Sequence, residues 1–160
     1  MTSSLHELLW RDPEIEKLFT PEAEIAAILQ FEAVLAQAQL KHDLVIPEAA
    51  AAIAGLCAGF APDMAALAAG IMRDGMIVPE LMRQLRAALP EAHRDSLHLR
   101  STSQDAIDTA LVLRLRDAIA TFRSRMADVL ACLDDLDRRF GDVSQMARTR
   151  MQRALSTRAG

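Results

Sequence analysis

The chain has 160 residues, of which 51% are hydrophobic, 25% charged and 4% aromatic. This composition favours a helical protein over a β-rich one, folded as one domain or as an elongated chain of two segments. The formal net charge of -4 argues against a general nucleic-acid binder, because such a protein needs a basic surface to displace counterions from phosphates.

The first predicted helix begins at residue 21. Residues 20–24 combine a threonine cap, a proline at the first helical position and two carboxylates in the first turn. The helix is apolar on most sides, so we expect neighbours to enclose most of it. Its narrow polar strip runs through Gln30, Gln37 and Lys41. It should end before Pro47, because the residue before a proline is biased away from the helical conformation.

Three short helices are predicted next, at 47–56, 62–72 and 79–89. Each opens with a proline, and together they should form a compact head. The polar loops 73–76 and 91–100 are the segments most able to carry function, because loops hold polar groups that a core cannot satisfy.

A long amphipathic helix is predicted from Asp105 onwards, and it separates an N-terminal helical domain, 1–104, from the start of a long-helix bundle, 105–160. Thr102 and Asp105 have the spacing of a capping box. The helix should be on the order of 50 Å long, and the chain offers few partners of matching length. We therefore expect its apolar stripe to be buried against other subunits or missing sequence. The stripe comprises Leu111, Leu115, Ala118, Phe122, Met126, Val129, Leu133, Leu136 and Phe140.

Residues 98–105 carry the strongest functional signal. They place an imidazole, a guanidinium, hydroxyls and an amide at the start of the long helix, where unpaired N–H groups and the helix dipole favour an anion. In a functional interpretation, Thr102 and Ser103 hold a substrate carboxylate while His98 supplies or orients a proton. The alternative is a plain helix cap beside a surface histidine.

A second candidate lies near the end of the chain. Residues 148–158 contain four arginines, which is typical of a solvated helix end. In such a helix Thr149 and Gln152 are three residues apart, so they would share a face and offer polar groups to a ligand.

The cysteines and the first residues indicate the compartment. Cys57 and Cys132 are too few and too far apart for a disulfide framework or a CxxC metal site, and both lie in apolar helical patterns. Residues 1–7 lack the basic stretch of a signal peptide, and the apolar run 49–60 is too short to span a membrane. We expect a cytoplasmic protein that is neither exported nor embedded in a membrane.

No metal or nucleotide motif is visible. The four histidines have no metal-ligand spacing, and the sequence contains no HExxH, glycine-rich phosphate loop or GxSxG motif. We expect neither a metal nor another cofactor.

Three segments resemble the fumarase/aspartase superfamily. Residues 98–117, HLRSTSQDAIDTALVLRLRD, resemble its first conserved segment, and residues 147–155, ARTRMQRAL, resemble its second. The opening pattern LLWRDPEIEKLFTPEAEIAAILQFEAVLAQAQ, followed by VIPEAAAAI, is most similar to the superfamily's 3-carboxy-cis,cis-muconate cycloisomerases. The resemblance covers nearly the whole chain.

The resemblance implies an all-α fold, in which a head of short helices precedes the first long helix of a central bundle, and a homotetramer with active sites where subunits meet. It also implies addition to, or elimination from, the carbon beside a carboxylate, through an enolate-like intermediate. In the cycloisomerases, 3-carboxy-cis,cis-muconate or a related muconate closes to a muconolactone in aromatic-compound degradation. The implied partner is thus a small polycarboxylate substrate.

Carried over residue by residue, the resemblance implies catalytic roles for His98 and Ser103. The matching substrate-binding positions are Arg100, Ser101, Thr102, Gln104, Thr149, Arg150 and Gln152.

Three departures from the family pattern matter. Arg100 and Ser101 stand where the family has glycine and a small residue, which narrows the pocket or adds positive charge. Arg150 stands where many of its lyases have histidine, which argues against a fumarase or an adenylosuccinate lyase. The family continues beyond the second segment to a loop with its catalytic serine. We therefore expect an N-terminal part, truncated or frameshifted, that is incomplete as a catalyst.

Two other functions stay open. One is a non-catalytic helical oligomerisation module, in which the segment 98–105 is only a cap. The other is a different lyase of the same superfamily.

Overall fold

The computed structural model describes residues 9–160 and divides into two compact units, one ending at Asp117 and the other comprising Ala118–Gly160. The prediction that a signal peptide is lacking depends on residues 1–7, which lie outside the described residues. The division falls within the longest helix, whereas the sequence pattern places a domain boundary at residue 104. That assignment of domains stays a prediction.

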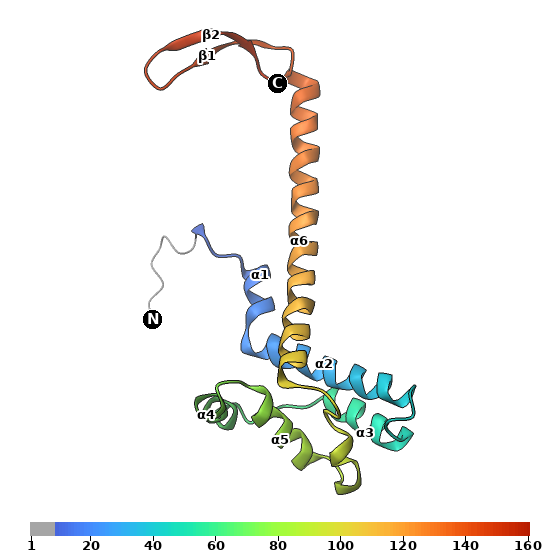
Figure 1. Cartoon of the computed structure of the whole chain (residues 1–160). Helices are drawn as coiled ribbons and strands as arrows, with labels where there is room; N and C mark the ends of the chain where they lie inside the picture. The colour runs from blue at the N-terminus through green and yellow to red at the C-terminus, as the bar shows by residue number, and fades with distance from the viewer. Residues whose placement is uncertain (1–8) are drawn as a thin grey trace. The chain divides into compact units, whose positions relative to one another are not determined.

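Helix α2 spans Pro21–Leu40 and begins as the sequence predicts (Figure 1). The Thr20 hydroxyl accepts a hydrogen bond from a first-turn N–H at 3.2 Å. The single turn α1 (Pro13–Glu16) and the 3-10 turn η2 (Lys17–Phe19) precede it. One side of α2 is buried, but Val34 is exposed, so neighbours enclose less of the helix than expected.

Three short helices follow: α3 (Pro47–Cys57), α4 (Met64–Asp74) and α5 (Val78–Ala88). Their bounds agree with the predicted helices to within two residues. Helix α4 ends at Gly75, whose φ of 73° lies in the left-handed region that glycine adopts without steric cost. The 3-10 helix η3 (Glu91–Ser96) then leads towards α6.

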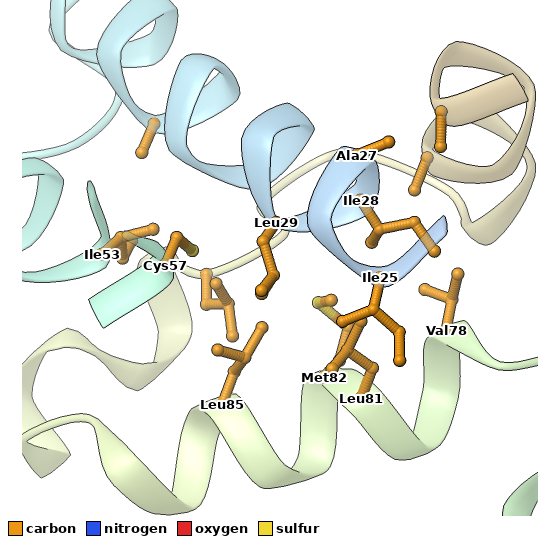
Figure 2. Packing of buried hydrophobic residues seen from close by; sticks show 14 of the residues in the cluster. Ile25, Ala27, Ile28, Leu29, Ile53, Cys57, Val78, Leu81, Met82 and Leu85 are labelled. Atoms are coloured by element: carbon orange, nitrogen blue, oxygen red, sulfur yellow. The ribbon is translucent and has the colours of Figure 1, made fainter. Parts of the chain in front are cut away.

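The core of the first unit lies where α2 packs with α3 and α5 (Figure 2). Ala106 and Ala110 of α6 are fully buried in the same cluster, and their small side chains let the helix approach closely. Cys57 is buried there as expected, whereas Cys132 is exposed, so the prediction that it packs as a small hydrophobe is wrong. The largest fully buried apolar side chains are Ile28, Ile53, Leu67, Leu81, Leu85, Leu97 and Val78.

A buried carboxylate, Glu80, links α4 to α5. It accepts hydrogen bonds from Arg73, Arg83 and Gln84. The Gln84 amide oxygen also accepts from the backbone N–H of Asp63, the residue that caps α4, at 2.8 Å. The Gln84 hydrogen bond, followed by the two arginines, holds the pKa of Glu80 below its ordinary value near 4.5. Both helices are thus fixed by one ionised network.

Helix α6 spans Ser103–Phe140 and contains the predicted long helix. Its apolar stripe is exposed at every predicted position except Ala118. The exposed residues are Leu111, Leu115, Phe122, Met126, Val129, Leu133, Leu136 and Phe140. Within the described residues, this face of the helix lacks the cover that its pattern predicts.

The chain after α6 is a β-hairpin, which corrects the prediction of a basic helix end. Strand β1 (Ser144–Arg148) pairs antiparallel with β2 (Arg153–Arg158). The Thr149 N–H donates to the Gln152 carbonyl at 2.8 Å, and the Thr149 hydroxyl also bonds to the Gln152 backbone. These local bonds give the backbone an alternative to the helix. The all-α prediction is confirmed for the rest of the described chain, and this hairpin is the departure from it.

None of the helices in the described part of the chain is long and apolar enough to cross a membrane.

We expect Gly70→Ala to destabilise the fold. A Cβ at this position of α4 would lie 2.5 Å from the Cβ of Glu80. Overpacking costs about 1–3 kcal/mol, which exceeds the gain of about 1 kcal/mol for replacing a helical glycine by alanine. Denaturant unfolding followed by circular dichroism measures the difference.

Gly55→Ala in α3 is the matched control, because nothing in the described structure lies within 4 Å of its added Cβ. It should stabilise the chain by about 0.5–1 kcal/mol. Equal stabilisation by both variants would contradict the close contact between α4 and α5.

The Glu80 network also predicts a loss of stability in acid. The pKa of Glu80 is lower in the folded chain than in the unfolded chain, so its ionised form stabilises the fold at neutral pH. This contribution should disappear as the pH falls from about 4.5 through the lowered pKa. Thermal unfolding at a series of pH values measures it. Glu80→Gln should be less stable at neutral pH and show a flatter acid limb, whereas the exposed control Glu48→Gln should retain the wild-type profile. Parallel profiles for all three proteins would contradict the assignment.

Candidate anion-binding loop at the start of helix α6

The loop of residues 97–102 joins η3 to α6 within the first unit. Leu97 is 1% exposed and anchors the loop in the core, while Arg100 and Thr102 are exposed. The segment 98–105 that the sequence singles out therefore starts at the core and ends in the first turn of the long helix.

Two residues of the loop have left-handed backbone conformations. The φ angles are 57° at His98 and 54° at Arg100, in a region that L-residues other than glycine adopt at a steric cost. The family pattern has glycine where this chain has Arg100. The backbone thus keeps the conformation that suits glycine, while the residue carries a guanidinium into solvent.

Thr102 and Asp105 form the predicted capping box. The Asp105 carboxylate accepts hydrogen bonds from the Thr102 N–H and hydroxyl, both at 2.8 Å, and the Asp105 N–H donates to the Thr102 oxygen at 3.3 Å. Ser101 adds a longer bond to the same carboxylate at 3.5 Å. The Thr102 backbone N–H is the main cause that holds the pKa of Asp105 below its ordinary value. The Thr102 hydroxyl is therefore engaged in the cap.

Ser103 and Gln104 follow in the first turn of α6. Ser103 is half-buried, and no hydrogen bond of its hydroxyl is found within residues 9–160. The Gln104 amide donates to the Asp108 carboxylate at 2.6 Å, so it lies along the helix surface. Of the predicted carboxylate-binding hydroxyls, Ser103 is thus the one that the cap leaves available.

Helix α2 holds the loop through two buried polar side chains that the sequence interpretation missed. His98 Nδ1 lies 2.6 Å from Glu32 Oε1, and the Gln39 amide donates to the Leu99 carbonyl at 2.5 Å. The predicted polar strip of α2 is exposed, but Glu32 and Gln39 are on the buried side. A glutamate and a glutamine seven residues apart among apolar neighbours were the available signal.

The second group of predicted residues lies apart from this loop in the chain. Thr149, Arg150 and Gln152 belong to the hairpin turn of the second unit, where Thr149 and Gln152 bond to each other. Residues 98–105 thus form one local site in the first unit. Residues 149–152 form a separate turn in the second unit.

A cavity of about 480 Å3 opens elsewhere in the first unit. Apolar side chains of α2 and α4 line it, including Ile25, Leu67 and Ile71, with Glu24 at one side. None of its lining residues belongs to the loop 97–102, so the cavity and the candidate site are separate features.

Comparison with known proteins gives the family. Residues 11–160 match a family model described as lyase. The chain belongs to the lyase family. It is 33% identical to the 3-carboxy-cis,cis-muconate cycloisomerase of Pseudomonas putida, over 100% of this chain and 39% of that protein. The corresponding cycloisomerase of Pseudomonas aeruginosa is 36% identical over 89% of this chain and 32% of its own length.

Solved structures agree with this membership. The 3-carboxy-cis,cis-muconate lactonizing enzyme of Pseudomonas putida matches with a TM-score of 0.88 and 30% identity, over 98% of this chain and 36% of that one. A fumarate lyase from Mesorhizobium sp. BNC1 matches with a TM-score of 0.83 and 34% identity, over 91% of this chain and 34% of that one. These matches confirm the fumarase/aspartase resemblance and the helical fold class. The chain spans about a third of the length of these relatives.

The left-handed backbone at Arg100 predicts an unusual order of stability for two variants. Arg100→Gly relieves the steric cost of the positive φ, whereas Arg100→Ala removes the same charge and keeps the cost. We expect the glycine variant to be more stable than the alanine variant by about 1 kcal/mol, measured by denaturant unfolding. At an ordinary helical or extended position the order would reverse, so an alanine variant that is the more stable one would rule out this backbone conformation.

Proposed function

We propose that this chain forms the N-terminal part of a cycloisomerase that closes 3-carboxy-cis,cis-muconate, or a related muconate, to a muconolactone. The observation that carries the proposal is the loop 98–103 at the start of α6, within a chain similar along its whole length to such an enzyme. The loop offers a hydroxyl, an imidazole and the first N–H groups of a helix to a carboxylate.

In this proposal Ser103 and the first-turn N–H groups of α6 bind a substrate carboxylate. Thr102 caps the helix and does not itself bind the substrate through its hydroxyl, because that hydroxyl is bonded to Asp105. Arg100, Ser101 and Gln104 flank the substrate, and Arg100 adds positive charge for a polyanion. Thr149, Arg150 and Gln152 of the hairpin turn are further proposed substrate-binding residues.

The chemistry requires one new bond and one proton. A carboxylate oxygen of the substrate forms a C–O bond with an alkene carbon, and the displaced electron pair moves to the carbon beside another carboxylate. That enolate-like centre then takes up a proton, which His98 can deliver from its imidazolium form, leaving the ring neutral. Hydrogen-bond donors around the second carboxylate stabilise the charge as it develops.

A different lyase of the superfamily is the second candidate. The Mesorhizobium fumarate lyase structure favours it with 34% identity, and so does an N-acetyl-S-(2-succino)cysteine lyase of Enterococcus italicus with 31% identity over 89% of this chain. Both candidate functions use the same carboxylate-binding loop. They differ in the substrate that the remaining residues of the site select.

The same proposal extends to the oligomeric state, the metabolic role and the cellular compartment. The exposed apolar stripe of α6 supports self-association, which we propose is a homotetramer in the complete enzyme. The proposed role is in the degradation of aromatic compounds in the cytoplasm, with a small polycarboxylate as the substrate.

Binding of the muconate by this chain tests the proposal. We expect 3-carboxy-cis,cis-muconate to bind, and Ser103→Ala to weaken binding by about 5- to 150-fold, the effect of removing a buried donor worth roughly 1–3 kcal/mol. Isothermal titration calorimetry measures the affinity, and ultraviolet absorbance of the same samples over time reports turnover.

Ser124→Ala is the matched control, because it removes an exposed hydroxyl farther along α6. Equal affinities for all three proteins would reduce Ser103 to part of the helix start. Tighter binding of fumarate or a succinylated thiol than of the muconate would favour the second candidate.

A further inference from the structure

Two buried polar side chains on one face of α2 are hydrogen-bonded to the candidate loop. Glu32 is 1% exposed and Gln39 is 6% exposed, and they are separated by seven residues, about two helical turns. Burying such groups is costly unless they are hydrogen-bonded. Each side chain makes a hydrogen bond to a different residue of the loop.

Their bonds fall on consecutive loop residues. Glu32 Oε1 lies 2.6 Å from His98 Nδ1, and the Gln39 amide donates to the Leu99 carbonyl. His98 has a φ of 57°, a conformation that costs a residue of this kind energy, so the surrounding contacts must hold it in place. The two bonds from α2 supply that constraint.

The chemistry of the Glu32 contact also fixes the hydrogen on the imidazole. A carboxylate accepts hydrogen bonds and cannot donate, so with Glu32 in its carboxylate form the hydrogen of the 2.6 Å contact is on His98 Nδ1. A neutral imidazole carries only one ring hydrogen, which leaves Nε2 as the nitrogen with the lone pair.

The charge of Glu32 also acts on the thiol of Cys57. Burial, with a further contribution from the Glu32 charge, raises the pKa of the Cys57 thiol to about 11. The thiol therefore stays neutral near neutral pH and adds no second negative charge to that of Glu32.

We propose that Glu32 is a positioning residue, which holds His98 as the Nδ1–H tautomer and leaves Nε2 as the basic atom of the loop. The assignment of Nε2 to proton exchange with the substrate rests on the proposed function. The tautomer rests on the 2.6 Å contact with Glu32 in its carboxylate form. Glu32 itself acts through His98 and is separated from the substrate by it.

Nitrogen-15 NMR of the histidine rings tests the proposal directly in the 160-residue chain. At alkaline pH, where the imidazole is neutral, long-range proton–nitrogen correlations distinguish the two tautomers. We expect His98 to be the Nδ1–H form in the wild type. In Glu32→Gln, whose amide can donate as well as accept, we expect the signals to shift towards the Nε2–H form.

His98→Asn separates the chemical role from the structural one. The asparagine amide nitrogen can take the place of Nδ1 beside Glu32, and asparagine tolerates a positive φ better than most residues. We expect this variant to keep the wild-type unfolding midpoint, because the tie to α2 survives while Nε2 is lost. His98→Leu, which can make no such bond, should unfold at a lower temperature.

An Nε2–H tautomer in the wild type, or the same tautomer in wild type and Glu32→Gln, would overturn the proposal. Failure of the proposed function gives a different result. In that case the tautomer is as expected, but the muconate does not bind and its addition leaves the His98 signals unmoved.

Discussion

The fold of the first unit depends on how α2 meets the segment before α6. Most of that contact is apolar, but two hydrogen bonds, from His98 to Glu32 and from Gln39 to the Leu99 carbonyl, constrain the conformation of the loop. Apolar packing is non-directional and tolerates small shifts, whereas hydrogen bonds weaken steeply when their geometry changes. The core therefore supplies most of the stability, and the two polar bonds supply the geometry. A loop with left-handed residues needs the second kind of constraint.

The same division explains what the sequence predicts and what it misses. Helix starts are local, so the Thr20 cap of α2 and the capping box of α6 follow directly from neighbouring residues. The tie between Glu32 and His98 joins residues 66 positions apart. The spacing of Glu32 and Gln39 marks polar groups on an apolar side of α2, but no local pattern indicates which residue Glu32 contacts. The residue types of the loop 98–105 predict the candidate site, whereas its contacts with Glu32 and Gln39 depend on the tertiary fold.

At the hairpin after α6 the sequence pattern predicts the wrong local structure, a helix end instead of two strands. Arginines at 148, 150 and 153 are compatible with a solvated helix, and charge patterns carry little information about backbone conformation. The deciding contact is the bond of the Thr149 hydroxyl to the backbone of Gln152, which closes a turn within four residues. Threonine is disfavoured in helix interiors because of such competing bonds and because its β-branched side chain loses χ1 freedom there. The exposed stripe of α6 is a different case, since its period is read correctly from the sequence and no segment of the described chain covers it.

The start of α6 is a weaker anion site by itself than its position implies. The positive end of the helix dipole is offset by the Asp105 carboxylate, which accepts the Thr102 N–H and the Thr102 hydroxyl. A dianionic or trianionic ligand would meet that negative charge, so the loop needs compensating cationic or donor groups. Arg100 supplies a permanent positive charge from a backbone conformation that glycine would occupy at less cost. The loop therefore combines two costly features. Arg100 gives it positive charge from a strained backbone, and the buried Glu32 of α2 orients the His98 imidazole.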